Sequence, residues 1–335
     1  MANDMTDQLQ EELIKIRNGR DASFFDLTSV DQLTLSDIAL ILELATKFKQ
    51  GKTAKLTLCK GRSQVNAFFE ASTRTMSSFD LAAKNLGMDT TSVGSASSST
   101  KKGESFIDTV ETLSSYNLAT LIIRCTQAGG PEFAAKHISA GVINAGDGWH
   151  EHPSQALLDA MTMLEEFKSK DLSGRVVTIV GDIMHSRVFG SLVRILKKLN
   201  ATVRVAAPET FFPDFMENFG VTPYYDADEA LVGSDVIYAL RVQEERGGGG
   251  FIPTLREYSK TFGISPRRLK IAKPTAILMH PGPVVRDIDV HSVLVARHPQ
   301  SRILTQVENG MAVRKALLWL IAERYDGKVK DFAPL

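Results

Sequence analysis

Short runs of β-branched and aliphatic residues alternate along the chain with longer segments whose apolar positions repeat at the helical period. The runs that predict strands are Val65–Glu70, Ala119–Arg124, Gly141–Asn144, Val176–Gly181, Thr202–Ala206, Asp235–Leu240 and Thr275–His280. This alternation is typical of parallel sheets whose strands are joined by crossover helices. We therefore expect an α/β protein built on doubly wound parallel sheets.

The helical segments between these runs have recognisable ends. Ser36 precedes an amphipathic segment that closes at Gly51, as an N-cap residue and a C′ glycine would. Further helices are predicted from Ser154, from Arg187 to Asn200, and from Asn309 to Tyr325. These segments are long enough to connect parallel strands.

Length and charge narrow the class of protein. At roughly 100–200 residues per domain, the 335 residues divide into two domains, and the strand pattern resumes after residues 150–175, where we place the boundary. The 39 Lys and Arg residues balance 39 Asp and Glu residues, so the chain lacks the general attraction on which nucleic-acid and anionic-membrane binders rely. Any affinity for an anion must come from individually placed side chains.

The cysteines and the apolar stretches indicate a cytoplasmic protein. Neither Cys59 nor Cys125 stands in a CxxC or Cys/His metal spacing, which predicts two reduced thiols. The N-terminal segment lacks the apolar core of a secretory signal. The apolar run Ala316–Ala322 is far shorter than the roughly 20 residues that span a bilayer. We expect no membrane association and no nucleic-acid partner.

Two segments depart from the regular pattern. Residues 92–103 are rich in Ser and Thr and end near a lysine pair, and residues 246–250 read Arg-Gly-Gly-Gly-Gly. By composition both fit flexible surface linkers. Long loops inside compact domains are also often lids over a site, so both segments are candidates for parts that move.

The first candidate site follows the first predicted strand. Ser72, Thr73, Arg74 and Thr75 stand where this strand ends and a helical pattern begins. The first turn of a helix offers unpaired backbone N–H groups and the positive end of the helix dipole, both of which favour an anion. The guanidinium of Arg74 adds a bidentate phosphate contact. Any one of these residues alone fits a helix cap or a solvated side chain, but the cluster predicts a phosphate site.

A second polar cluster covers residues 146–155. Its two histidines and two acids fit a metal site at first sight, but no second cluster supplies further ligands, and we expect no metal. His152 and Gln155 lie three residues apart at the start of a helix, so both can face one small ligand. The alternative is that His152 is simply a hydrogen-bonded core histidine.

Three later strand ends also carry polar residues. They present Arg187, then Arg241 with Gln243, then the rigid turn of Pro281 and Gly282. Open α/β sheets bind ligands at this edge, and the absence of a GxGxxG pattern excludes the usual dinucleotide fingerprint. Cations, amides and hydroxyls without paired carboxylates predict a site for a small pair of anionic substrates.

Six motifs in a fixed order resemble those of aspartate carbamoyltransferase catalytic chains. They read F-x-E-x-S-T-R-T, S-x-x-x-K-K-G-E, H-P-x-Q-x-L-L-D, G-D-x-x-H-S-R, R-x-Q-x-E-R and H-P-G-P. The resemblance implies two doubly wound parallel-sheet domains linked by helices, in a carbamoyltransferase-like fold. It assigns carbamoyl phosphate to residues 1–153 and 307–335, and aspartate to residues 154–306.

The resemblance also implies the role of each residue that matches a motif. The residues for carbamoyl phosphate are Ser72, Thr73, Arg74, Thr75, Ser98, Lys102, Arg124, His152, Gln155, Pro281 and Gly282. The residues for aspartate are Lys102, Arg187, Arg241 and Gln243. The residues that act on the reacting atoms are Arg74, Thr75, Lys102, Arg124 and His152.

The implied reaction joins carbamoyl phosphate and L-aspartate into N-carbamoyl-L-aspartate and phosphate, in pyrimidine biosynthesis and without a cofactor or metal. In this family Ser98 and Lys102 reach into the site of the neighbouring subunit, which implies a homotrimer with shared active sites. The sequence leaves open whether such trimers join a regulatory chain or a dihydroorotase.

Two alternatives remain. Ornithine carbamoyltransferases share the phosphate-binding half, but they typically have Cys where this chain has Ser154 and Pro281, and a cationic substrate needs acidic partners. Acetylornithine is a further alternative acceptor. A catalytically silent assembly or regulatory homologue is the other alternative, and such a chain is expected to have lost phosphate-site residues. One departure from the bacterial pattern is Val285-Arg286-Asp287 in place of Asn-Arg-Gly, which bears on aspartate affinity.

Overall fold

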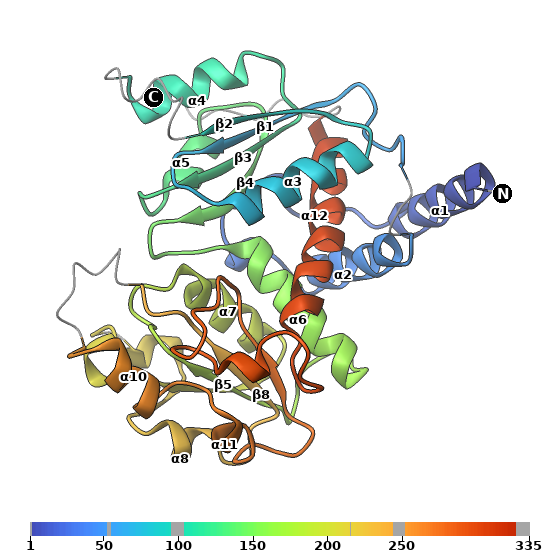
Figure 1. Cartoon of the computed structure of the whole chain (residues 1–335). Helices are drawn as coiled ribbons and strands as arrows, with labels where there is room; N and C mark the ends of the chain where they lie inside the picture. The colour runs from blue at the N-terminus through green and yellow to red at the C-terminus, as the bar shows by residue number, and fades with distance from the viewer. Residues whose placement is uncertain (1, 52–54, 95–103, 215, 244–251, 326–335) are drawn as a thin grey trace. The chain divides into compact units, whose positions relative to one another are not determined.

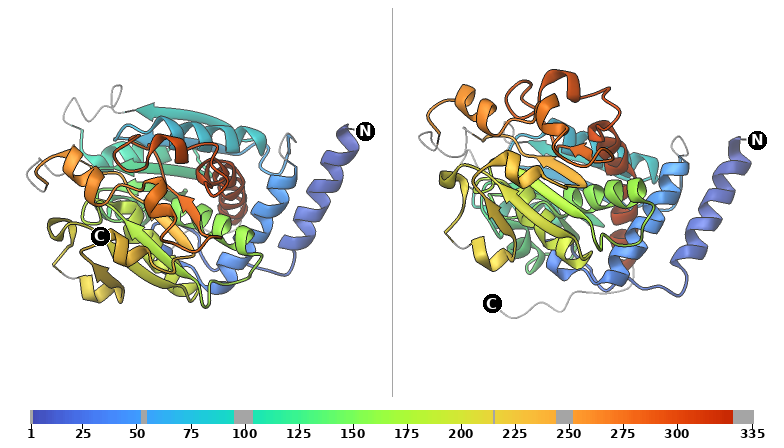
Figure 2. Two further views of the ribbon diagram at one scale, coloured as in Figure 1. Left: turned by 60° about the horizontal axis from the view of Figure 1, so that its bottom comes forward. Right: turned by 90° about the horizontal axis from the view of Figure 1, so that it is seen from below.

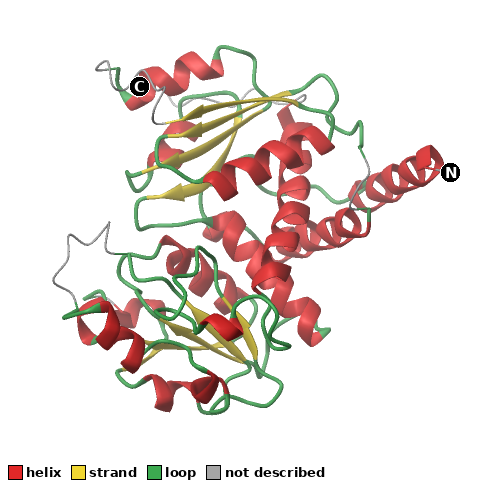
Figure 3. Ribbon diagram, viewed as in Figure 1, coloured by secondary structure: helices red, strands yellow, loops and turns green. Residues whose placement is uncertain are grey.

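The chain folds into two compact units, each built on one parallel sheet. The computed structural model describes residues 2–51, 55–94, 104–214, 216–243 and 252–325. The first unit holds Met1–Leu158 and Glu308–Leu335, and the second holds Asp159–Val307. Helices flank both sheets (Figures 1 and 3). The expected fold class, two doubly wound parallel-sheet domains, is confirmed.

The sheet of the first unit has the order β2-β1-β3-β4. Its strands are β1 (Ser63–Phe68), β2 (Asp89–Gly94), β3 (Thr120–Cys125) and β4 (Gly141–Asp147). Its helices are α1 (Ala2–Arg17), α2 (Leu35–Gln50), α3 (Thr73–Asn85), α4 (Phe106–Ser114) and α5 (Gly130–Ala135), with a 3-10 turn η1 (Val30–Gln32). Helix α3 packs on β1 and β2, and α5 packs on β3 and β4. Val65, Leu121 and Val142 are buried in the core between the sheet and its helices, as expected for parallel strands covered on both faces.

The sheet of the second unit has the order β7-β6-β5-β8-β9. Its strands are β5 (Val176–Val180), β6 (Thr202–Ala206), β7 (Thr222–Tyr224), β8 (Val236–Ala239) and β9 (Ile277–Met279). Its helices are α7 (Arg187–Lys198), α8 (Ala227–Leu231), α10 (Leu255–Thr261) and α11 (Pro266–Leu269), with 3-10 turns η3 (Glu209–Phe211), η4 (Met216–Phe219) and η5 (Ser292–Leu294). All strand pairings in both sheets are parallel.

Two helices carry the chain across the boundary between the units. They are α6 (Pro153–Phe167) and α12 (Ile303–Tyr325). Within the first unit, the ring of Trp319 on α12 packs edge-on against that of Phe48 on α2, with the ring centroids 6.1 Å apart. The N-terminal helix α1 lies beside α2 (Figure 2). No helix within the described ranges combines the length and the apolarity needed to cross a membrane.

The sequence predicted the buried strands and missed the exposed ones. Each of the seven predicted runs overlaps an observed strand, but β2 and β7 were not predicted. Both are edge strands in which every residue is exposed or half-buried, so neither shows the apolar run that marks a central strand. Helix α12 begins at Ile303, six residues before the predicted Asn309.

The predicted N-cap at Ser36 is wrong. Helix α2 begins at Leu35, and its N-cap is Thr34, whose hydroxyl accepts the backbone N–H of Asp37 at 3.1 Å. Asp37 in turn accepts the backbone N–H of Thr34, which completes a capping box. Gly51 does end the helix, but as the C-cap with φ −94°, not as a left-handed C′ residue. A Cβ on Gly51 would meet a terminal methyl group of Leu9 on α1, which would have to turn aside.

Lys315 is a buried ammonium group within α12. Its exposed fraction is 3%, and desolvation by burial lowers its pKa below the usual 10.5. We expect Lys315→Met to raise the free energy of unfolding by about 1–2 kcal/mol at pH 7, because a charged amine is costly to keep away from water. Urea unfolding measures the change, and Lys84→Met, at an exposed position of α3, should have little effect.

The pH dependence of this stability difference has a definite sign. Since the folded pKa of Lys315 is lowered, the unfolded state binds more protons between that pKa and 10.5, and the stability of the native protein rises with pH in this window. The advantage of the Met variant should therefore be complete at neutral pH and shrink as the pH approaches the pKa of a free lysine. An advantage that does not change with pH would contradict this account.

Candidate active site

The predicted phosphate turn lies at the start of α3. Ser72 is the N-cap residue, but its hydroxyl makes no capping hydrogen bond, so the simple helix-cap interpretation does not hold. Thr73 and Arg74 are exposed, and Thr75 is 9% exposed. The first backbone N–H groups of a helix have no intrahelical acceptor. This turn therefore offers N–H groups, hydroxyls and a guanidinium to an anion.

Helix α12 braces this turn from the same unit. The guanidinium of Arg314 lies over the ring of Phe79, 5.0 Å from its centroid, and donates to the hydroxyl of Ser78. Ser78 donates in turn to the backbone carbonyl of Thr75 at 2.9 Å. A cation on α12 thus helps to fix the first turn of α3. Arg314 was not predicted as a site residue, since 236 residues separate it from Ser78 and no local signal connects them.

Arg124 comes to the same edge of the sheet. It pairs in register with Phe68 of β1, and its backbone carbonyl accepts the N–H of Phe69 at 2.8 Å. Its half-buried guanidinium donates to the Ala145 carbonyl at 3.2 Å and to Glu70 Oε1 at 3.4 Å. Parallel pairing of β1 with β3 therefore places Arg124 near the loop that leads to Ser72.

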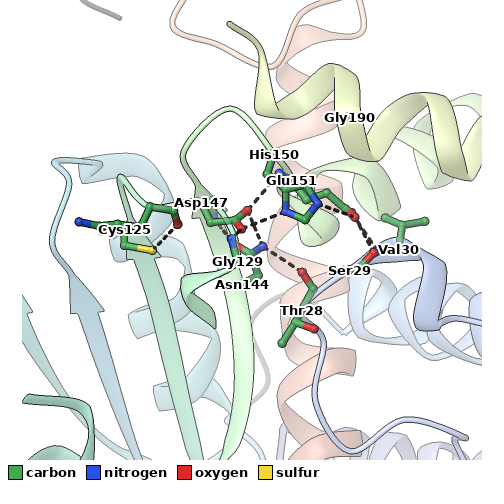
Figure 4. Close-up of polar contacts among 12 residues, drawn as sticks. Thr28, Ser29, Val30, Cys125, Gly129, Asn144, Asp147, His150, Glu151 and Gly190 are labelled. Atoms are coloured by element: carbon green, nitrogen blue, oxygen red, sulfur yellow. Dashed lines mark hydrogen bonds and ion pairs between the residues drawn. The ribbon is translucent and has the colours of Figure 1, made fainter. Parts of the chain in front are cut away.

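The turn between β4 and α6 is held by two buried carboxylates (Figure 4). Asp147 accepts hydrogen bonds from the Gly129 N–H at 2.7 Å and from Asn144 Nδ2 at 2.8 Å. The carboxylate of Glu151 accepts the Val30 N–H at 2.9 Å and the hydroxyl of Ser29. Both acids have side chains that are 1% exposed. They fix the segment that leads directly into His152.

His150 lies beside both of these carboxylates. Its Nδ1 lies 3.0 Å from Asp147 Oδ2, and its Nε2 lies 3.9 Å from Glu151 Oε1. Figure 4 shows the imidazole between the two acids. Across the described part of the chain, no three His, Cys, Asp or Glu side chains are grouped as metal ligands would be. His152 and Gln155 are both buried, at the start of α6.

In the second unit, Asp182 joins two of the predicted strand ends. Its side chain is 1% exposed, and Oδ1 accepts both the backbone N–H of His185, at 3.1 Å, and His185 Nδ1, at 2.8 Å. Its Oδ2 accepts the backbone N–H of Gln243 at 3.0 Å. The loop before Arg187 and the segment of Arg241 and Gln243 are thus tied to one carboxylate.

The two arginines differ in exposure. Arg187 is 3% exposed at the first position of α7, behind the N-cap Ser186. Arg241 and Gln243 are half-buried, whereas Val242 between them is buried. This alternation agrees with the expectation that Arg241 and Gln243 point to the same side.

The turn that follows β9 is the third polar strand end of this unit. Pro281 and Gly282 are half-buried, and Gly282 has φ +70°, which favours glycine. The peptide bond between Gly282 and Pro283 is cis.

Asp287 stands where the bacterial pattern has glycine, and it also has a positive φ, +66°. Asp tolerates this conformation better than most residues. Its carboxylate accepts the backbone N–H and the hydroxyl of Ser292 at 2.8 and 2.7 Å. These hydrogen bonds lower the pKa of Asp287. The departure therefore keeps the turn and adds an anchor to η5.

The structure gathers the predicted residues into two sets. In the first unit, the Ser72–Thr75 turn follows β1, and His152 and Gln155 follow β4. Arg124 is the penultimate residue of β3, which lies between those two strands in the sheet. In the second unit, Arg187, the Arg241–Gln243 segment and the Pro281–Gly282 turn follow β5, β8 and β9, also neighbours. Ser98, Lys102 and the glycine run at 247–250 lie outside the described residues.

The sequence analysis did not identify the carboxylates that hold these two sets of residues in place. Asp182 was part of a quoted motif but had no assigned role, and Glu151 was considered only as a metal ligand. Both instead accept hydrogen bonds that hold segments carrying predicted site residues. An acid directly after a buried strand, as at Asp182, is the one signal that would have drawn attention.

Two family models match the chain in succession. Residues 26–165 match the model described as "Aspartate/ornithine carbamoyltransferase, carbamoyl-P binding domain". Residues 173–321 match "Aspartate/ornithine carbamoyltransferase, Asp/Orn binding domain". Together they cover both units.

Curated relatives and solved structures agree with these models. The chain is 44% identical over 299 residues to the aspartate carbamoyltransferase catalytic subunit of Syntrophotalea carbinolica, covering 88% of this chain and 95% of that one. It is 47% identical to the corresponding subunit of Moorella thermoacetica, covering 88% and 96%. Among solved structures, Trypanosoma cruzi aspartate transcarbamoylase in complex with carbamoyl aspartate and phosphate superposes with a TM-score of 0.79, at 32% identity, over 88% of this chain and 95% of that one.

Proposed function

Because the chain belongs to the aspartate/ornithine carbamoyltransferase family, we propose that it transfers the carbamoyl group of carbamoyl phosphate to the amino group of L-aspartate. The products are N-carbamoyl-L-aspartate and phosphate, and the reaction serves pyrimidine biosynthesis. One observation carries the choice of aspartate: the acceptor-side strand ends present Arg187, Arg241 and Gln243, and the acid beside them, Asp182, is buried and already accepts hydrogen bonds at both oxygens.

The carbamoyl phosphate half is assigned to residues 1–153 and 307–335, and the aspartate half to residues 154–306. Ser72, Thr73, Arg74 and Thr75 bind the phosphate, and Arg124 contributes a further guanidinium. The first turn of α3 supports this assignment, since its N–H groups, hydroxyls and arginine are all suited to a dianion.

The chemistry requires stabilisation of charge more than a protein nucleophile. The neutral amine of aspartate attacks the carbamoyl carbon, negative charge develops on the carbamoyl oxygen, and phosphate leaves with the bonding pair. Thr75, Arg124 and His152 donate to that oxygen. A preorganised donor of this kind lowers the activation barrier by roughly 3–4 kcal/mol. Gln155 and the backbone of Pro281 and Gly282 bind the carbamoyl NH₂. The leaving phosphate accepts the amine proton.

Alignment of the two substrates supplies the rest of the rate. Arg187, Arg241 and Gln243 bind the aspartate carboxylates, so that the amine meets the carbamoyl carbon in a productive orientation. Lys102 contacts both substrates. No step needs a metal or an organic cofactor.

We expect purified protein to carbamoylate L-aspartate at least about 1,000-fold more efficiently than L-ornithine or N-acetyl-L-ornithine, because a site built of cations and amides leaves a cationic or neutral side chain without partners. Product formation with the three acceptors in parallel measures this. Turnover with ornithine or acetylornithine would keep the carbamoyl phosphate half and replace the acceptor. No turnover with any of them would favour a silent assembly or regulatory homologue.

A matched pair of variants connects the preference to the predicted residues. Arg241→Gln should raise the KM for aspartate about 100-fold, as expected when a charge-assisted contact to a carboxylate is lost. Arg175→Gln is the control, because Arg175 belongs to the same unit but precedes β5 and pairs with Asp235. This control variant should leave the KM for aspartate and the KM for carbamoyl phosphate unchanged.

The assembly and the location follow from the same proposal. Completion of each site by Ser98 and Lys102 of a neighbouring subunit requires a homotrimer. Whether a regulatory chain or a dihydroorotase joins that trimer is open. A cytoplasmic location is supported by two buried cysteines that form no disulfide.

A further inference from the structure

The turn after β9 is held by a histidine that lies inside the fold. The side chains of His280 and Asp289 both have 0% exposure. The backbone N–H of His280 donates to Gln306 Oε1 at 2.9 Å, which attaches the end of β9 to α12. The imidazole is therefore fixed at its base and shielded from water.

Hydrogen bonding defines the tautomer of this ring. His280 Nδ1 lies 2.8 Å from the backbone nitrogen of Gly282. A backbone N–H can only donate, so Nδ1 must be the acceptor and the neutral ring carries its proton on Nε2. That Nε2 lies 3.3 Å from Asp289 Oδ2, to which it donates. The ring thus connects the turn amide on one side to a carboxylate on the other.

Asp289 holds the other end of the same turn. Its Oδ2 also accepts the backbone N–H of Val285 at 2.8 Å, and its backbone carbonyl accepts the N–H of Ile264 at 2.9 Å. Its Oδ1 is buried without a hydrogen-bond partner among the described residues. One carboxylate oxygen therefore fixes both Val285 and, through His280, Gly282.

The groups around the pair keep it in this state. Tyr258 of α10 is 3% exposed. Burial, followed by the carboxylates of Asp289 and Asp182, raises the pKa of Tyr258 well above its usual value, against a smaller opposing effect of Arg268. The phenol of Tyr258 therefore stays neutral and adds no negative charge beside Asp289.

We propose that His280 and Asp289 form a positioning pair that sets the orientation of the Pro281–Gly282 backbone toward the carbamoyl group. The inference rests on the proposed function, which gives that backbone its ligand. The pair touches no substrate and acts only through the turn. Protonation of His280 would cost the Gly282 hydrogen bond, so the neutral ring is the working form.

The alternative is a pair that only stabilises the fold, and the variants separate the two roles. His280→Asn retains a side-chain oxygen that can accept the N–H two residues later, as in an Asx turn, but it does not reach Asp289. His280→Gln can reach Asp289 but loses that local acceptor. Asp289→Asn keeps a side-chain oxygen that can accept from both His280 Nε2 and the Val285 N–H. Asp289→Ala removes that acceptor.

We expect His280→Ala to lower kcat by about 10- to 100-fold with the KM for aspartate within about twofold, because the turn is displaced while the carboxylate-binding arginines are untouched. His280→Asn should recover most of kcat and His280→Gln should not. Asp289→Ala should resemble His280→Ala, Asp289→Asn should stay near wild type, and the double alanine variant should be no worse than either single one.

Thr178→Val is the control for stability. Thr178 is buried in β5 and hydrogen-bonds to Ser234 at 2.6 Å and to the Ala230 carbonyl at 3.1 Å, far from the turn in sequence. This variant should lower the melting temperature without changing kcat. Losses of kcat that follow melting temperature in all variants, or equal values for His280→Asn and His280→Gln, would overturn the positioning role.

Backbone hydrogen exchange tests the pair without using activity. The Gly282 and Val285 amides should exchange at least about tenfold faster in Asp289→Ala than in wild type or Thr178→Val, since local opening becomes easier. The two proposals can fail separately. If wild type does not carbamoylate aspartate but the amides exchange faster in Asp289→Ala, the proposed function is wrong, while the conclusion that Asp289 holds the turn remains supported. If wild type is active and neither exchange nor kcat changes, the positioning pair is refuted.

Discussion

Arg74→Ala is expected to lower kcat/KM for carbamoyl phosphate by about 1,000-fold while the free energy of unfolding stays within about 0.5 kcal/mol of wild type. Arg74 is exposed at the second position of α3, so little packing is lost with its side chain. By the proposal, its guanidinium supplies both a charge and a bidentate contact to a phosphate whose negative charge grows as it leaves. Both effects are strongest in the transition state, so kcat should fall as well as affinity.

Two variants make this expectation specific. Arg74→Lys keeps the charge and loses the bidentate contact, so its activity should lie between those of wild type and the alanine variant. Lys84→Ala, near the other end of the same helix, should have no effect on kinetics. Steady-state kinetics and urea unfolding measure both quantities. If kcat/KM of Arg74→Ala stayed within tenfold of wild type, the assignment of the phosphate to the start of α3 would be wrong.

The positions of the candidate site residues could be predicted because parallel strands end at one edge. Arg124 and Ser72 are far apart in sequence, yet pairing of β1 with β3 brings Arg124 beside Phe68, just before the phosphate turn. Apolar runs identify such strands, and polar residues directly after them are the natural candidates for a site. The same reasoning located Arg187, Arg241 and the Pro281–Gly282 turn in the second unit.

The residues that hold those segments could not be predicted in the same way. Glu151 binds Ser29 across 122 positions, and Arg314 binds Ser78 across 236. Neither contact follows from a period or a motif, because it depends on how two elements pack after the chain has folded. Asp289 is only nine residues from His280, but the loop between them has no regular hydrogen-bonding pattern from which the contact could be read.

The exposed edge strands β2 and β7 were not predicted for a related reason. In β2 the side chains are exposed or half-buried throughout, so burial did not select the apolar alternation that identifies a strand. The prediction began helix α12 too late for the same reason. Leu304 and Val307 are exposed, so the first turns of this helix lack a clear apolar stripe. Sequence patterns report burial, and elements that are only partly buried are predicted less completely.

Mixed trimers of two inactive variants are expected to regain activity. By the proposal, each site takes Arg74 from one subunit and Lys102 from its neighbour, so Arg74→Ala and Lys102→Ala chains are each nearly inactive alone. When the two chains are co-expressed in equal amounts and assemble at random, roughly a quarter of the sites combine an intact Arg74 with an intact neighbouring Lys102. Purification by a different tag on each chain removes the trimers of a single variant. Each remaining mixed trimer has one such site of its three, so its activity should be about a third of that of wild type.

A second mixture distinguishes shared sites from other causes of recovery. Arg74 and Arg124 both belong to the first unit of one subunit, so no arrangement of Arg74→Ala and Arg124→Ala chains produces an intact site, and this mixture should stay inactive. Recovery in the first mixture alone means that Lys102 acts across a subunit boundary. If neither mixture recovers, each site is completed within one chain, and the trimer is no longer required for catalysis.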